Sequence, residues 1–238
     1  MPEELNLKRR KRIFLWVLLL LPFFLNDLAY LFLIKDPVTA VVFDFVLRVF
    51  LIAIIYFKYY KFGFSGVDLG LIRLPLKNMI PWTLAFLVAY LFIITPLINS
   101  DFLIEFARTL DVLVSAVWKG LFGIFFHPYR YPLIEHPALV FFDLTVSLLL
   151  VAFTEEFVAR SMAYKVLKDF NLGDKSVIFI SAIIFALYHW GLGSLSVMAT
   201  FCFGILAMWL FIKKRSLMPV VVLHYLTNLY FFGKLYLG

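Results

Sequence analysis

The sequence predicts an all-α protein, a polytopic bundle of seven transmembrane helices. Of its 238 residues 64% are hydrophobic and only 16% are charged, whereas a soluble domain has about 45–50% apolar and about 25% charged residues. Apolar runs recur along nearly the whole chain, and a helix needs about 20 such residues to cross a bilayer core. Because these runs are solid rather than alternating, they favour helices over a transmembrane β-barrel.

The charge pattern points to a membrane surface rather than to nucleic acid. The net charge is +7, but the Lys and Arg residues form short clusters beside apolar runs, where such clusters orient helices. Cys202 is the single cysteine, which excludes an intrachain disulfide and a cysteine zinc site. We therefore expect membrane lipids as partners and no nucleic acid. The sequence specifies no oligomeric state.

The first span follows a basic cluster that ends at Arg12. This arrangement resembles a signal peptide, but the apolar run is too long and has no small-residue cleavage site, so a retained helix is predicted. The other spans follow from the remaining apolar runs. The seven predicted spans are residues 13–34, 39–57, 80–98, 138–168, 176–190, 195–212 and 217–232.

Segment 102–126 is the ambiguous stretch, because polar residues recur along it at helical spacing. If this segment crosses the membrane, there are eight spans and two basic loops lie outside, against the positive-inside rule. If it does not cross, the N-terminus and the basic loops are all cytoplasmic. The rule favours an interfacial or partly inserted helix here. The polar residues are Glu105, Arg108, Ser115 and Lys119, and the loops are 58–79, 169–175 and 213–216.

Two neighbouring glutamates lie in the fourth predicted span. Glu156 and Arg160 share a helix face at a spacing of four residues and can pair, whereas Glu155 points away from both and is expected to stay unpaired. Charged side chains that persist inside a membrane usually face a cavity and carry function. A carboxylate of this kind is suited to act as a general base. The alternative is that the helix leaves the membrane at Thr154 and both glutamates are hydrated.

Histidines in the later spans are predicted to approach the same layer. Glu155 and His189 lie equally far along the chain from the turn at Leu172, so an antiparallel hairpin brings them to one depth. His224 and Asn228 share one helical face. They can donate hydrogen bonds to an oxyanion, or His224 can join His189 and Glu155 as a metal ligand. A polar pair that joins two helices is the structural alternative for His224 and Asn228.

Further charged residues lie within or near the predicted spans. Asp44 and Arg48 are predicted to form a structural pair at a spacing of four residues, and Asp143 lies near the outer end of its span, where it can be hydrated. His127 and His136 lie in a proline-rich loop and are predicted to be surface residues. Asp27 is a further carboxylate in the first span.

Together these residues form a set of motifs on three apolar helices. Glu155, Glu156 and Arg160 come first, Phe185 and His189 follow at a spacing of four, and His224 and Asn228 close the set. This set resembles the CPBP intramembrane protease family, also called ABI. That family includes CAAX prenyl endopeptidases of the Rce1 type and bacteriocin-processing and immunity proteins. The resemblance covers about residues 138–232.

The resemblance implies roles for these residues. Glu155 would be the catalytic glutamate that activates a water together with His189, and His224 and Asn228 would form the oxyanion hole. The other motif residues, Glu156, Arg160 and Phe185, would be structural. The family's glutamate-type mechanism needs no metal, so we expect no cofactor. Zinc held by Glu155, His189 and His224 is the alternative.

The predicted function is an intramembrane endopeptidase that cleaves a peptide or a lipidated, CAAX-like protein tail. A proton-coupled transporter is one alternative, because intramembrane Glu and His residues also occur there. A non-catalytic immunity or scaffold protein is the other. Residues 1–137 are predicted to form N-terminal helices plus the interfacial segment, and residues 138–238 a catalytic four-helix core of the same membrane domain. A prokaryotic plasma membrane with a cytoplasmic N-terminus is the expected location.

Overall fold

The structure is a computed structural model that describes residues 2–58 and 61–237. Residues 1 and 238, at the outer ends of the two predicted parts, and residues 59–60, in the predicted loop 58–79, lie outside the described residues. Helices dominate, and no strand occurs in the described ranges. The predicted all-helical class is therefore confirmed.

Five helical stretches are long and apolar enough to cross a membrane within the part of the chain that the structure describes. They are Asn6–Phe32, Pro37–Lys58, Leu76–Ile98, Pro137–Asp169 and Ser194–Lys214. Each coincides with a predicted span. Two predicted spans are not among them, namely α9 (Asp174–Leu187), which has only 14 residues, and α11 (Met218–Leu237). The count of seven or eight spans stays a prediction.

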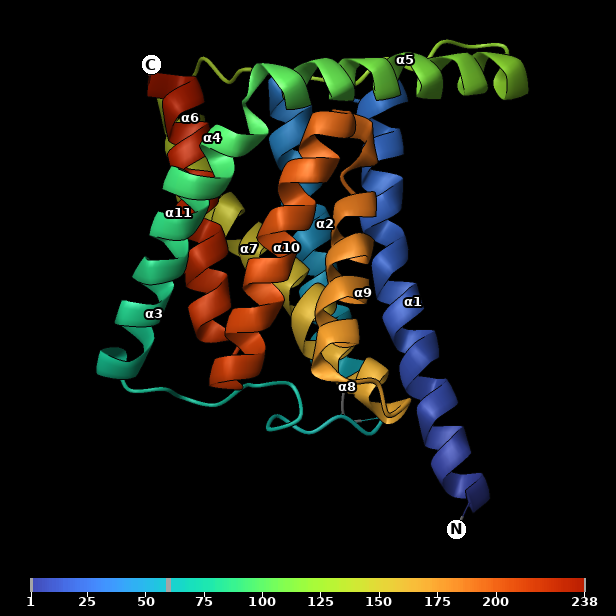
Figure 1. Cartoon of the computed structure of the whole chain (residues 1–238), viewed down its shortest axis with the longest axis vertical. Coiled ribbons are helices and arrows are strands. Elements are labelled where there is room, and N and C mark those ends of the chain that lie inside the picture. The colour runs from blue at the N-terminus through green and yellow to red at the C-terminus, as the bar shows by residue number, and fades with distance from the viewer. Residues whose placement is uncertain (1, 59–60, 238) are drawn as a thin grey trace.

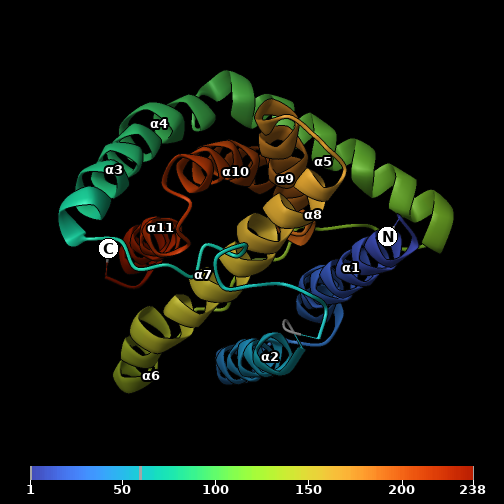
Figure 2. The ribbon, with the colours of Figure 1, turned by 90° about the horizontal axis from the view of Figure 1, so that it is seen from below.

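The helices of the N-terminal part lie on two sides of the bundle, with α1 (Pro2–Phe32) and α2 (Pro37–Lys58) on one side and α3 (Leu76–Ala89) on the other (Figures 1 and 2). α1 and α2 are antiparallel neighbours, and a long connection leads to α3. The π-helical turn η1 (Tyr90–Ile94) and the short α4 (Thr95–Ile98) continue α3 as one rod. α3 packs against α11, which is far from it in the chain.

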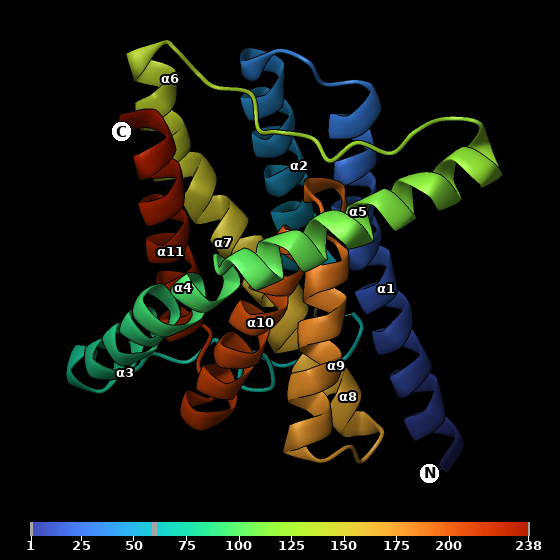
Figure 3. The ribbon, with the colours of Figure 1, turned by 45° about the horizontal axis from the view of Figure 1, so that its top comes forward.

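α5 (Asp101–Phe122) lies across one end of the bundle, roughly perpendicular to the other helices (Figures 1 and 3). It ends at Gly123, whose φ of 72° is the left-handed conformation that glycine adopts readily. Two thirds or more of the Glu105 and Arg108 side chains are exposed. This crosswise placement is the one expected of an interfacial helix.

The fourth predicted span is one continuous rod through the middle of the molecule. It comprises α6 (Pro137–Phe142), η2 (Asp143–Ser147), α7 (Leu148–Glu156), η3 (Phe157–Met162) and α8 (Ala163–Asp169). Figure 2 shows this rod passing between α1 and α2 on one side and α10 and α11 on the other. The two π-helical stretches bracket α7, and such bulges are frequent at functional sites.

The last helices complete the bundle. α9 follows the predicted turn and packs tightly on α10 (Ser194–Lys214). Gly204 allows this approach, because a Cβ there would lie only 2.9 Å from the Cα of Ala182. A short turn leads to α11. The basic loops all lie at one end of the bundle, at the bottom of Figure 1, together with the N-terminus.

Candidate active site

The buried ion pair of the first motif is present as predicted. Arg160 Nε lies 3.0 Å from Glu156 Oε2, and both side chains are 0% exposed. The guanidinium also stands 4.3 Å from the centroid of the Phe185 ring and donates to Ser181 Oγ at 3.2 Å. The pair thereby ties the central rod to α9. A hydrated helix end at Thr154 is excluded, because Glu155 and Glu156 are both buried.

The expectation of an unpaired Glu155 is wrong. Arg48 Nη2 of α2 lies 3.1 Å from Glu155 Oε1, and only 6% of the Glu155 side chain is exposed. The predicted pair of Asp44 and Arg48 is confirmed, with Nη2 to Oδ1 at 3.0 Å, but the same guanidinium also reaches across to α7. The sequence concealed this contact because helix spacing predicts pairs within one helix and not between two.

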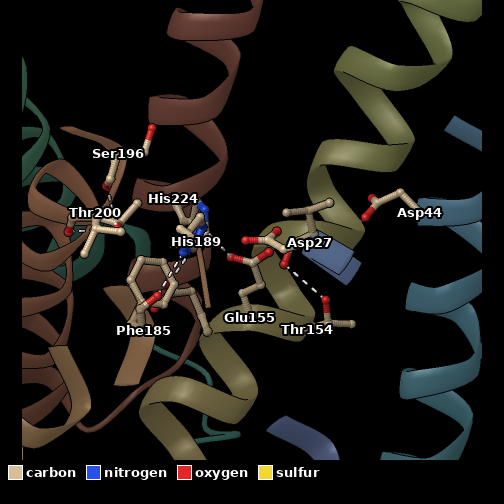
Figure 4. Close-up of polar contacts among 12 residues, drawn as sticks. Asp27, Asp44, Thr154, Glu155, Phe185, His189, Ser196, Thr200 and His224 are labelled. Carbon is tan, nitrogen blue, oxygen red and sulfur yellow. Dashed lines mark hydrogen bonds and ion pairs between the residues drawn. The ribbon is translucent and has the colours of Figure 1, made fainter. Parts of the chain in front are cut away.

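His189 meets Glu155 as the hairpin predicts. His189 Nε2 lies 3.8 Å from Glu155 Oε2, and Figure 4 shows the two side chains facing each other. His189 stands just beyond the end of α9, not within the helix as the predicted span 176–190 implies. Its Nδ1 lies 2.8 Å from the carbonyl oxygen of Phe185. Because a carbonyl only accepts, Nδ1 carries the proton and Nε2 of a neutral ring is left as an acceptor toward Glu155.

His224 and Asn228 project from α11 into the same region. His224 Nδ1 lies 2.8 Å from Glu156 Oε1, so the second glutamate orients this imidazole. The sequence did not foresee that contact, which again joins two helices. Asn228 lies one turn further along α11 and lines the cavity beside His224. The two residues that could stabilise an oxyanion thus stand together.

A cavity of about 370 Å³ brings these four side chains onto one surface. Its wall is mixed, with aromatic rings from several helices and a set of polar groups. The N-terminal helices α1 and α2 contribute Phe23 and four of the polar residues to that wall. The polar residues that line it include Asn26, Asp27, Asp44, Arg48, Asp143, Glu155, His189, Ser196, Thr200, His224, Thr227 and Asn228.

Asp27 of α1 fastens the loop that follows His189. Its Oδ2 accepts the Gly191 N–H at 2.6 Å and its Oδ1 accepts the Tyr129 hydroxyl at 3.1 Å. Burial and the charge of Asp27 raise the pKa of Tyr129 well above its ordinary value, so the phenol keeps its proton and donates a hydrogen bond to Asp27. A Cβ at Gly191 would lie 2.9 Å from Asp27 and 2.8 Å from Tyr129. Only glycine lets the loop approach this closely.

Three further residues singled out from the sequence lie at or outside the cavity. Asp143 is 1% exposed, lines the cavity and accepts a hydrogen bond from the Tyr236 hydroxyl at 3.2 Å. His127 and His136 are exposed in the loop between α5 and α6, as predicted.

The three residues of the alternative zinc site, Glu155, His189 and His224, all line the cavity. Arg48 contacts Oε1 of Glu155, and Glu156 contacts Nδ1 of His224. Among residues 2–58 and 61–237, no group of three or more His, Cys, Asp or Glu side chains could hold a metal ion.

The fold and the cavity define a class, namely a helical integral membrane protein with buried carboxylates, imidazoles and an amide on one internal surface. Residues 137–230 match the family model of the Rce1-like type II CAAX prenyl endopeptidases. The family resemblance drawn from the motifs is therefore confirmed over this segment, which is similar to the Rce1-like CAAX prenyl endopeptidases. No curated protein and no solved structure matched the chain.

Proposed function

We propose that this protein is an intramembrane endopeptidase that uses Glu155 and His189 to activate a water for attack on a peptide bond. The observation that carries the proposal is the approach of Glu155 Oε2 to His189 Nε2, at 3.8 Å, on the wall of an internal cavity. A water held between two acceptors can donate one hydrogen bond to each. Its oxygen lone pairs then remain free for a substrate carbonyl.

The proposed reaction needs one proton acceptor and one proton donor. Glu155 takes a proton from the water as its oxygen bonds to the carbonyl carbon, and His189 holds the water in line. The carbonyl oxygen becomes an oxyanion. When the C–N bond breaks, the proton passes to the departing amine. The second proton of the water also leaves the new carboxyl group for the amine, so the products are a carboxylate and an ammonium group and the atoms balance.

His224 and Asn228 are the proposed oxyanion hole. Hydrogen-bond donors that are fixed before the reaction stabilise the developing charge without reorganisation. The Glu156 carboxylate accepts from His224 Nδ1 and fixes the ring, so Nε2 donates to the oxyanion when the ring carries a proton on both nitrogens. Asn228 supplies a side-chain amide on the same face. Glu156 and Arg160 therefore act through His224 in this proposal.

The proposed chemistry uses no metal. The position of the Asn228 amide beside His224 on the cavity wall supports this view, because a histidine and an amide on one face suit the stabilisation of an oxyanion. A chelator is therefore expected to leave turnover unchanged.

The proposed substrate is a peptide or a prenylated protein tail that reaches the cavity from the membrane. The apolar part of the cavity wall, with Phe23, Tyr90 and Phe231, suits an apolar substrate. We further propose a cytoplasmic N-terminus, since the basic loops share one end of the bundle with it. The prokaryotic plasma membrane and the division at residue 137 stay predictions.

The test is incubation of the purified protein in detergent or lipid with candidate peptides, including prenylated CAAX-like peptides. Products are identified by mass spectrometry, with and without a chelator. The proposal expects one amide bond cleaved, equally in both conditions. Loss of cleavage on chelation would overturn the metal-free mechanism. The absence of any product from folded protein would favour a binding role instead.

A further inference from the structure

Arg48 lies outside the family-matched segment and touches the proposed catalytic carboxylate. It lies on α2, while the match begins at residue 137. Its side chain is 4% exposed, and its Nη2 stands 3.1 Å from Glu155 Oε1. We infer that Arg48 is a positioning residue, which holds the Glu155 carboxylate in the orientation that proton transfer requires. The inference rests on the proposed function.

Three contacts fix the guanidinium in one place. Asp44, one turn earlier on α2, accepts from Nε at 3.2 Å and from Nη2 at 3.0 Å. The Phe23 ring of α1 lies below the guanidinium, with its centroid 5.0 Å from Cζ. Glu155 is the third contact. A planar guanidinium held in this way presents its N–H groups in a fixed direction.

The two carboxylate oxygens of Glu155 have different partners because of this contact. Oε1 is taken by Arg48, while Oε2 faces His189 and has no hydrogen-bond partner among the residues described. Without Arg48 the carboxylate could rotate and present either oxygen to His189 or to neither. Arg48 therefore leaves one defined oxygen for the proton of the water.

Stability alone does not account for this cluster. Burying charged groups in a membrane bundle is costly, and well-packed apolar side chains of similar volume often stabilise a fold as well as a buried ion pair does. A contact between α2 and α7 could thus be made more simply by apolar residues. The guanidinium contacts Glu155, the proposed catalytic residue, so the buried charge is explained by a role in positioning that carboxylate.

Two variants separate positioning from packing. Arg48→Lys keeps the charge but loses the planar fork. The double variant Asp44→Asn with Arg48→Met removes the pair without leaving Asp44 as an orphaned charge. A matched control is Arg12→Lys, since Arg12 Nη1 also joins two helices, at 2.7 Å from Asp169 Oδ2, far from the cavity. Thermal unfolding shows which variants are folded.

The measurements are kcat and KM for a peptide that the wild type cleaves. Misplacing a catalytic group by about 1 Å can cost about 100-fold in rate. We expect kcat to fall about tenfold in Arg48→Lys and about 100-fold in the double variant, with KM changed less than about twofold. Millimolar guanidinium ions should restore part of the kcat of the double variant, and Arg12→Lys should behave as wild type.

The outcomes are separable. A wild type that cleaves no peptide overturns the proposed function, and the role of Arg48 with it. A wild type that cleaves, beside a folded double variant with unchanged kcat, overturns the role of Arg48 alone. A fall in kcat that guanidinium does not restore and that accompanies a lower melting temperature assigns Arg48 a structural role, which also overturns the inference.

Discussion

The family-matched segment and the helices that precede it contribute different things to the same cavity. Residues 137–230 supply the four side chains proposed to do chemistry, namely Glu155, His189, His224 and Asn228. The preceding helices α1 and α2 supply partners that hold two of them, Arg48 for Glu155 and Asp27 for the loop after His189.

The motif residues alone therefore do not complete the candidate site. Glu156 orients His224 from within the matched segment, but Glu155 depends on a cation that the segment does not contain. A buried carboxylate without a partner is costly in free energy. The same motifs on another set of N-terminal helices would therefore need another partner for Glu155.

The largest effect is expected from the matched segment itself. Glu155→Gln or His189→Ala should lower cleavage by about 1,000-fold or more, because each removes a group from the proton transfer. Peptide cleavage followed by mass spectrometry measures the loss, and the melting temperature reports folding. Glu105→Gln on α5, whose side chain is 71% exposed, is the control. Normal turnover in either site variant would remove that residue from the mechanism.

A smaller loss is expected from the oxyanion hole. Asn228→Ala should reduce kcat by about 100-fold, since removal of one oxyanion donor costs about 10²–10³ in rate. KM should change little, because the donor acts on charge that develops only in the transition state. Steady-state kinetics with the cleaved peptide give both constants. An unchanged kcat would show that Asn228 only lines the wall.

Removing the contact between Asp27 and the loop at Gly191 should have a moderate effect on kcat. Asp27→Ala leaves the Gly191 N–H without its acceptor, and an unsatisfied buried donor costs about 1–3 kcal/mol. The loop that carries His189 then loosens, and kcat should fall about tenfold. Tyr129→Phe, which removes only the hydroxyl on the other oxygen of Asp27, should have a smaller effect. Equal activity in Asp27→Ala and wild type would show that Asp27 is not needed to hold the loop that carries His189.

The smallest effect is expected on the surface of α5. Arg108→Ala breaks an ion pair with Glu105 in which 72% and 71% of the two side chains are exposed. Exposed pairs of this kind contribute about 0–1 kcal/mol, so cleavage should stay within about twofold of wild type. Thermal unfolding and the cleavage assay check both statements. A large loss of activity would mean that α5 takes part in substrate binding.

The sequence predicted contacts that follow from local spacing. Glu156 with Arg160 and Asp44 with Arg48 are pairs four residues apart on one helix, and both form. The meeting of Glu155 with His189 followed from a hairpin with equal arms. Each of these predictions uses only the rise and periodicity of a helix.

The contacts that the sequence did not predict all join helices that are far apart in the chain. Arg48 with Glu155, His224 with Glu156, and Asp27 with Gly191 depend on which faces of the helices pack together. Most positions in these helices are apolar on every face, so no hydrophobic stripe marks the side that turns inward. For the same reason the burial of Asp143 escaped prediction.

A double-mutant cycle of Glu155→Gln and His189→Ala tests the central claim most directly. Single-turnover cleavage is measured for wild type, both single variants and the double variant at high protein concentration. If both side chains act on one water, the double variant should be no slower than the slower single variant, because the second change removes nothing further. Losses that multiply in the double variant would mean that Glu155 and His189 act independently, which contradicts the shared water.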